Sequence, residues 1–229
     1  MIAANPHARH DYILCAGPRI LPLDIAELTP ELEAMILPMI EINTIVNSRE
    51  ADNLTDVIGP DASAAGTADH TALLANLPEI MRTMLRHPAL FVCQTALGIE
   101  LLGRGSLPPR DRELAILRMG WLCQAPYEWG EHVLIAKKVG VTSEEIERIT
   151  IGSTAPGWSD HDRTILRAVE ELRDTAMISD ATWATLSDTF DEQQMIELPI
   201  LIGQYQAVAY YQNSLRLRLH DGNLGLDAR

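Results

Sequence analysis

Residues 107–149 read LPPRDRELAILRMGWLCQAPYEWGEHVLIAKKVGVTSEEIERI, and this stretch decides the fold. Two prolines stand near its start, Pro126 interrupts it, and Gly140 follows a second apolar segment. Proline near the start of a helix and glycine just after its end are typical helix boundaries. The pattern therefore predicts two helices that form an antiparallel hairpin around the short Gln124–Ala125 connection.

Similar signals predict helices on both sides of this hairpin. Towards the N-terminus they indicate one helix after Thr29 and two more over residues 73–87 and 88–103. Towards the C-terminus, pairs at capping-box or N-cap spacing predict four further helix starts: Thr142 with Glu145, Ser159 with Asp162, Ser179 with Thr182, and Asp191 with Gln194. The last helix is expected to run to about Arg218 and to bend at Pro199. Because no alternating strand pattern is present, the predicted fold is all-α.

The small, polar stretch at 59–69 predicts a boundary in the chain. We expect an N-terminal arm over residues 1–60, which contains one helix, and a helical domain over residues 70–219. Up to about Pro30 the arm lacks helical periodicity, and its segment PRILPLD is expected to lie extended.

Charge and composition restrict the possible partners. The net charge is −14, and a surface this acidic disfavours nucleic acid and anionic membranes but permits a small-molecule substrate in a pocket. The start of the chain lacks the pattern of a secretory signal, and the most apolar stretch contains polar residues and a proline. The three widely spaced cysteines suit a reducing cytoplasm, which is the predicted location.

The helix that begins at Pro126 carries the strongest chemical signal. Its positions 128, 132, 135, 136 and 139 share one face and read Glu, His, Ile, Ala and Val. Glu128 and His132 are four residues apart, so their side chains can meet. A carboxylate beside an imidazole raises the histidine pKa and fixes its tautomer, as a general acid or base near neutral pH requires.

Glu113 is the third candidate. It lies near the start of the preceding helix, which is apolar nearly all round and is therefore predicted to be buried. A buried carboxylate there is either a helix cap or a functional group. Whether Glu113 reaches Glu128 or His132 within its own hairpin, or only across a subunit contact, is left open by the sequence.

Structural roles are the alternative for each of these residues. Glu113 and Glu128 both lie in first turns, where acidic residues favour the helix dipole, and His132 could be a core histidine. Tyr127 and Trp129 flank Glu128 and could wall a substrate pocket, or they could simply pack between helices. No second Glu–His pair and no HExxH motif is present, so we expect neither a metal nor another cofactor.

The stretch from Ser106 to Ile149 resembles the core of carboxymuconolactone decarboxylase-like proteins. The shared pattern is an Arg-Glu-rich helix start, a Tyr-Glu-Trp-x-x-His helix, and Gly-Val-Ser/Thr-x-x-Glu-Ile. Flanking segments such as RHPALF and LIGQYQAVAYYQNSL extend the resemblance to residues 70–217. It implies an all-helical fold that assembles as a homo-oligomer, a trimer or hexamer, with active sites near subunit contacts.

The same superfamily includes alkyl hydroperoxidase D-like enzymes, which use a Cys-x-x-Cys pair. By position, their histidine corresponds to His132 and their upstream glutamate to Glu113, while the two cysteines correspond to Ala125 and Glu128. Cys123 is at the wrong position to replace either cysteine. Thiol–disulfide chemistry needs a resolving partner, so the comparison leaves a proton-transfer set instead.

The resulting prediction is a cofactor-independent lyase, decarboxylase-like, that acts by proton transfer on a small aromatic-derived carboxylate or lactone. Its predicted catalytic residues are His132, Glu128 and Glu113, and Trp129 and Tyr127 are its predicted substrate-binding residues. The alternatives are a thiol-dependent peroxidase and a non-catalytic binding protein with the same fold.

Overall fold

The computed structural model describes residues 6–38 and 77–229. Within these ranges every regular element is a helix and no strand is present, which confirms the all-α prediction. The chain divides into two compact units, one made of Ser106–Arg229 with the N-terminal segment up to Arg19, the other of Ile20–Gly105. The boundary predicted at 59–69 lies outside the described residues. Among the described helices, none combines the length and the apolar character needed to span a bilayer.

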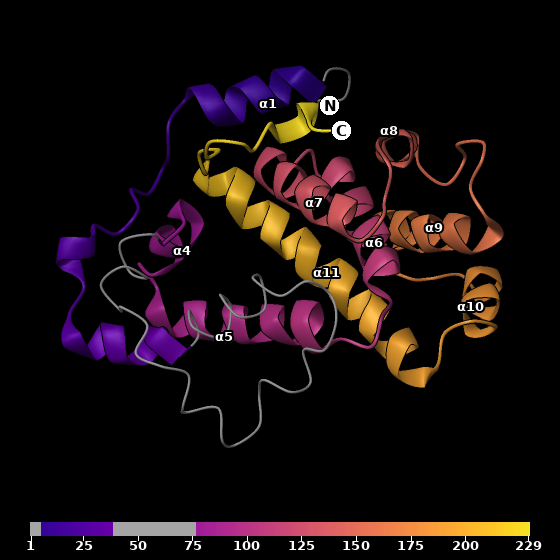
Figure 1. The fold of residues 1–229 in the computed structure, drawn as a ribbon, viewed down its shortest axis with the longest axis horizontal. Coiled ribbons are helices and arrows are strands. Elements are labelled where there is room, and N and C mark those ends of the chain that lie inside the picture. The colour runs from indigo at the N-terminus through magenta and orange to yellow at the C-terminus, as the bar shows by residue number, and fades with distance from the viewer. Residues whose placement is uncertain (1–5, 39–76) are drawn as a thin grey trace. The chain divides into compact units, whose positions relative to one another are not determined.

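The first unit is organised around one buried helix (Figure 1). Its elements are α1 (Pro6–Cys15), α6 (Pro109–Leu122), α7 (Pro126–Lys138), α8 (Ser143–Ile151), α9 (Asp160–Thr175), α10 (Asp180–Ser187), α11 (Glu192–Leu215) and the 3-10 turn η5 (Gly225–Asp227). Helix α6 packs against α7, α8, α9 and α11, and its positions from Glu113 to Gly120 are all buried. The apolar character of α6 on all sides is explained by these neighbours.

The predicted helix starts after α7 are confirmed. Thr142 and Asp191 form reciprocal capping boxes with Glu145 and Gln194. Ser159 and Ser179 likewise accept hydrogen bonds from backbone N–H groups in the first turns of α9 and α10. Each cap satisfies an N–H group that has no partner inside its helix.

Helix α11 continues through Pro199 and ends at Leu215, three residues before the predicted end at Arg218. Arg216 takes a left-handed conformation, with a φ of 56°, and terminates the helix. The bend expected at Pro199 stays a prediction.

Helix α1 corrects the expectation that the chain before Pro30 is non-helical. The sequence of α1 has little amphipathic character of its own, but the helix contacts η5 near the C-terminus. The Arg216 guanidinium lies 4.8 Å from the centre of the Tyr12 ring, and it donates a 2.7 Å hydrogen bond to the Tyr12 hydroxyl. These contacts join residues 204 positions apart, and local periodicity gives no sign of them.

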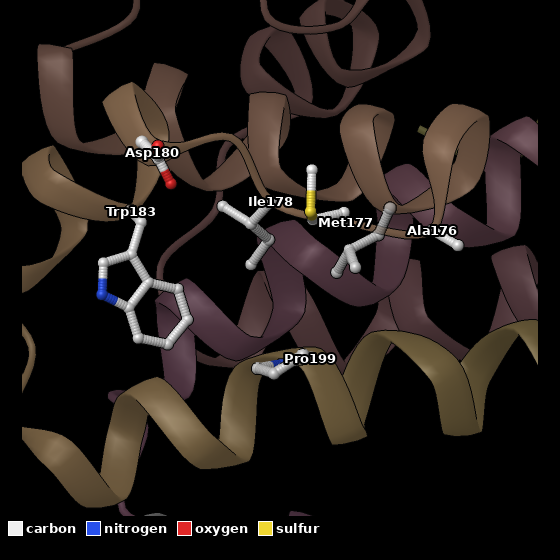
Figure 2. A pocket seen from close by; sticks show the side chains of 7 residues that line it. Ala176, Met177, Ile178, Asp180, Trp183 and Pro199 are labelled. Carbon is white, nitrogen blue, oxygen red and sulfur yellow. The ribbon is translucent and has the colours of Figure 1, made fainter.

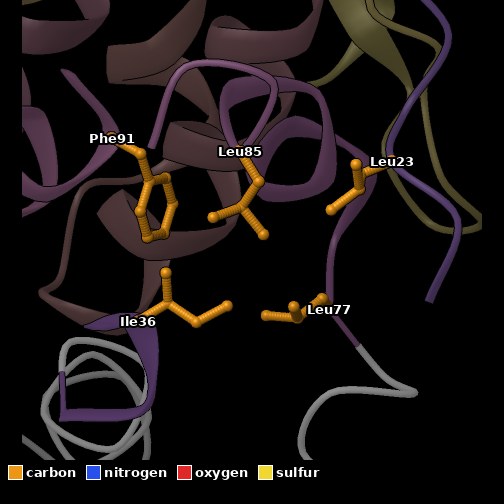
Figure 3. Packing of buried hydrophobic residues seen from close by; sticks show 5 residues of the cluster. All are labelled: Leu23, Ile36, Leu77, Leu85 and Phe91. Carbon is orange, nitrogen blue, oxygen red and sulfur yellow. The ribbon is translucent and has the colours of Figure 1, made fainter. Parts of the chain in front are cut away.

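The second unit has its own apolar core. Its helical segments are η1 (Ile25–Glu27), residues 30–38, α4 (Glu79–Met84), α5 (Pro88–Ile99) and the π-helical turn η4 (Glu100–Arg104). The helix predicted over 73–87 begins, within the described residues, only after Pro78, which is its N-cap. Figure 3 shows the buried side chains of this core: Leu23, Ile36, Leu77, Leu85 and Phe91.

Candidate active site

The side chains of Glu113, Glu128 and His132 meet inside the α6–α7 hairpin. His132 Nδ1 lies 2.7 Å from Glu113 Oε2, and His132 Nε2 lies 3.1 Å from Glu128 Oε1. Glu113 is 0% exposed, Glu128 is 4% exposed and His132 is 5% exposed. The imidazole is therefore held between two carboxylates and screened from bulk water.

The hairpin geometry explains this meeting. Glu128 and His132 are one turn apart on α7 and share a face. Glu113 lies 11 positions before Gln124 and His132 lies 8 positions after it. At about 1.5 Å of rise per residue, these two side chains are at comparable distances from the turn, on facing helices. The sequence left open whether Glu113 meets His132 within one hairpin or across a subunit contact. The structure shows that the two side chains meet within one hairpin of one chain.

Three further residues, none of which was predicted from the sequence, complete the cluster. Arg112 Nε donates to Glu113 Oε1 at 3.0 Å, and Gln212 Nε2 donates to Glu128 Oε2 at 2.6 Å. The Tyr205 ring packs edge-on against the His132 ring with 4.9 Å between centroids. Tyr205 and Gln212 are two turns apart on the buried face of α11. A polar amide at helical spacing on that otherwise apolar face is the signal that could have identified Gln212.

The two carboxylates determine the charge of His132. Burial alone would lower the pKa of the imidazole, but Glu113 and Glu128 outweigh burial and raise it to about 10. Burial, Glu128 and Glu113 also raise the pKa of the Tyr205 hydroxyl well above its ordinary value. At neutral pH the cluster therefore contains an imidazolium that donates one N–H to each carboxylate, beside a neutral phenol.

Trp129 and Tyr127 occupy packing positions around the C-terminal segment. The Trp129 side chain is fully buried, and its Nε1 donates to the Ala228 carbonyl at 3.0 Å. Tyr127 is 7% exposed, its ring meets the His220 ring edge-on at 6.3 Å, and its backbone carbonyl accepts from Asn223. These contacts give both aromatic residues a structural role, and their substrate-binding role stays a prediction.

Two other histidines have carboxylate partners that helical spacing could not indicate. His161 Nε2 lies 2.8 Å from Asp111 Oδ2, and His220 Nε2 lies 2.5 Å from Glu131 Oε1. The side chains of these histidines are 31% and 49% exposed, against 7% for His132. Only the His132 cluster, of these three, combines two carboxylates with full burial.

A surface hollow of about 440 Å³ lies among α9, α10 and α11, and none of its lining residues belongs to this cluster (Figure 2). Its lining is mainly apolar, and Asp180 is the one ionisable residue in it. The lining residues are Leu172, Ala176, Met177, Ile178, Asp180, Trp183 and Pro199. A lone exposed carboxylate beside apolar side chains offers no acid–base pair, so the hollow is a weaker candidate for chemistry than the buried cluster.

Cys123 is 4% exposed, and its sulfur lies 3.6 Å from the Met119 sulfur. Cys15 and Cys93 are exposed, and none of the three cysteines forms a disulfide. In the part of the chain that the structure describes, no group of three or more His, Cys, Asp and Glu side chains is arranged to hold a metal ion.

Comparison with known proteins identifies relatives of this fold. Residues 90–171 match the model of the carboxymuconolactone decarboxylase family. A peroxidase-related protein from Ralstonia eutropha, described as an AhpD core, superposes with a TM-score of 0.65 at 15% identity, covering 91% of this chain and 97% of its own. The debrominase Bmp8, solved in complex with 2,3,4-tribromopyrrole, gives a TM-score of 0.62 at 14% identity. The match covers 90% of this chain and 94% of the Bmp8 chain.

A second peroxidase-related protein, from Silicibacter sp., gives a TM-score of 0.58 at 16% identity and covers 67% of this chain and 82% of its own. No protein of curated function matches the sequence. At such identities the structural likeness establishes the fold and leaves the activity to be argued from the site. Residues 90–171 thus match the carboxymuconolactone decarboxylase family, and the fold of the chain is the one found in AhpD-like proteins.

Proposed function

We propose that this chain is a cofactor-independent, decarboxylase-like lyase that acts by proton transfer on a small aromatic-derived carboxylate or lactone. The observation that carries the proposal is the position of His132 between Glu113 and Glu128. Such a buried acid–base cluster costs folding free energy, because charged groups lose their hydration, and acid–base chemistry is a reason to retain it.

The geometry supports a specific order for the proton relay. Both ring nitrogens of His132 face carboxylate oxygens, so a proton from Nε2 passes first to Glu128. Glu128 also stands where the AhpD-like enzymes of the resemblance have their second redox cysteine, which makes it the residue expected to touch the substrate. Glu113, itself held by Arg112, stabilises the imidazolium from the other side.

In the proposed reaction, the bond between a substrate carbon and its carboxylate breaks and carbon dioxide leaves. The electron pair moves into a conjugated dienolate, and protonation of that carbon through Glu128 forms the new C–H bond. That proton comes from His132 Nε2 by way of Glu128, so the step leaves a neutral imidazole beside the Glu128 carboxylate, and one proton from solvent then restores the imidazolium. General acid catalysis of this kind contributes about 10²–10⁴-fold in rate.

The substrate size is supported by a relative of the same fold. The debrominase Bmp8 was solved with 2,3,4-tribromopyrrole, which is a small aromatic ring. The family model that matches residues 90–171 is named for decarboxylation. A small cyclic substrate for this chain agrees with both.

The redox alternative has less support from the site. Cys123 is buried against Met119. The position of the second redox cysteine is occupied by Glu128, which carries a carboxylate in place of a thiol. A reactive cysteine requires an accessible thiolate with a resolving partner nearby. We therefore place proton transfer ahead of peroxide chemistry.

We further propose that the chain works in the cytoplasm as a homo-oligomer, a trimer or hexamer. The three sparse cysteines, none of which forms a disulfide, support the location. The oligomer rests on the family resemblance alone, and light scattering of the purified protein tests it.

The test of the function is turnover of a panel of muconolactone-type lactones and aromatic acids by the wild type and by three variants. Glu113→Gln, Glu128→Gln and His132→Ala are each expected to lower kcat/KM by at least about 10²-fold on the substrate that the wild type consumes. His161→Ala is the matched control, because it removes a histidine paired with a carboxylate outside the cluster. Full turnover by both His132→Ala and Glu128→Gln would exclude the relay.

A further inference from the structure

Gln212 contacts the proposed relay from α11 in one orientation. The residue is 3% exposed, and its Nε2 donates to Glu128 Oε2 at 2.6 Å. An ionised carboxylate only accepts hydrogen bonds, so the amide nitrogen must face Glu128 and the amide oxygen must face away. The orientation of this side chain is therefore set by its charged neighbour.

The amide oxygen of Gln212 has no hydrogen-bond partner among the described residues, although it is buried. Buried acceptors are nearly always paired, because an unpaired acceptor loses its hydration without compensation. The Gln212 carbonyl thus presents a free acceptor one side chain away from Glu128, the residue proposed to deliver the proton.

The charges around this acceptor favour a neutral partner. Glu113 and Glu128 are balanced by the His132 imidazolium and by Arg112, so the cluster has no spare positive charge for an anionic group. Tyr205 and Tyr211 on α11 also interact electrostatically with Glu128, and burial raises the pKa of both phenols, which keeps them neutral. A neutral hydroxyl or N–H group fits this environment better than a carboxylate does.

We propose that the Gln212 carbonyl accepts a hydrogen bond from a hydroxyl or N–H group of the bound substrate, and that the site thereby selects substrates with a donor at this position. The inference rests on the proposed function, since it describes the substrate of the same site. It adds that the group beside Gln212 is a neutral donor and that any carboxylate of the substrate lies elsewhere.

Phenol and anisole test this selection directly, because the two probes differ in the hydroxyl hydrogen that anisole lacks. Isothermal titration of the wild type is expected to give a Kd for phenol about tenfold lower than that for anisole, the effect of one hydrogen bond to a buried acceptor. Gln212→Met keeps the side-chain length and removes the acceptor, so the two Kd values should converge. Gln206→Met is the control, because Gln206 lies on the same helix and donates to Tyr210 at the surface.

Several outcomes would overturn the proposal: equal affinity for both probes in the wild type, no saturable binding of phenol, or a phenol preference that survives in Gln212→Met. If Gln212→Met does not fold, a crystal structure of the wild type with phenol decides. It must place the phenol oxygen within about 3.2 Å of the Gln212 carbonyl oxygen, which is hydrogen-bond distance, and any other placement contradicts the inference. The proposed function fails independently, if His132→Ala and Glu128→Gln keep full lactone turnover while phenol selection by Gln212 persists.

Discussion

Glu113 and His132 are 19 positions apart in the sequence, and their side chains meet at 2.7 Å inside the α6–α7 hairpin. Burial of this pair has a consequence for folding as well as for chemistry. The Glu113 carboxylate and the His132 imidazolium both lose their hydration when the protein folds, and the attraction between them offsets part of that cost in free energy. Properties that report on this pair are therefore the most direct tests of the site.

Stability should fall as the pH rises through the titration of His132. The folded protein raises the pKa of His132 from 6.5 to about 10, so its contribution is complete below about pH 6.5 and is lost towards about pH 10. The unfolding free energy of the wild type should decrease over this range by up to about 1.4 kcal/mol per pH unit from this group. Urea titrations at several pH values measure the slope, and Glu113→Gln should reduce it.

Glu131→Gln is the matched control for that experiment, because Glu131 pairs with a histidine, His220, whose side chain is 49% exposed. Solvent screens such a pair, so this variant should leave the slope nearly unchanged. An NMR titration that finds His132 with a pKa near 6.5 would show that the carboxylates do not hold it charged.

Gly130→Ala should dislodge the C-terminal segment. A Cβ at position 130 would lie 1.8 Å from Asn223 Oδ1, while Asn223 donates to the Tyr127 carbonyl and to Glu131. Loss of these buried hydrogen bonds should destabilise the protein by about 1–3 kcal/mol. Hydrogen exchange should show faster exchange in residues 223–229.

Gly203→Ala is the control for Gly130→Ala, because no atom beyond the adjoining residues and backbone of its own helix lies within 4 Å of the added Cβ. Replacing a glycine inside a helix should stabilise α11 by about 0.5–1 kcal/mol. Equal effects of the two substitutions would contradict the close approach of Asn223 to α7.

Arg118→Met should be among the more damaging substitutions away from the site. The Arg118 side chain is 8% exposed, pairs with Glu170 at 2.9 Å and donates to the carbonyls of Ile149 and Thr150. Its loss removes the cation beside the partly buried Glu170 carboxylate and the donor to the last carbonyls of α8, for which we expect about 3–5 kcal/mol of destabilisation. Arg104→Met, which breaks an exposed pair with Glu100, should cost less than about 0.5 kcal/mol in the same denaturation assay.

The thiols should differ in reactivity. Cys15 and Cys93 are exposed and Cys123 is buried, so Ellman's reagent should modify two thiols in the native protein and the third only after denaturation. Rapid loss of all three in native buffer would show that Cys123 is accessible and would strengthen the peroxidase alternative. Cys123→Ser provides the assignment.

Local signals in the sequence determined most of the described helices and half of the candidate site. The prolines at the starts of α6 and α7 and the capping residues Thr142 and Asp191 act within one turn, so their effect can be predicted without the fold. The pairing of Glu128 with His132 is of the same kind, because a four-residue separation on a helix fixes a contact by itself.

Only the tertiary structure decided the rest. Gln212 reaches Glu128 across 84 positions, and Trp129 reaches Ala228 across 99, through packing between helices whose relative register no local pattern encodes. Helix α1 was missed for the same reason, since its contacts with η5 and Arg216 come from the far end of the chain. Periodicity shows which face of a helix is buried, whereas the partner on that face depends on how all the helices pack together.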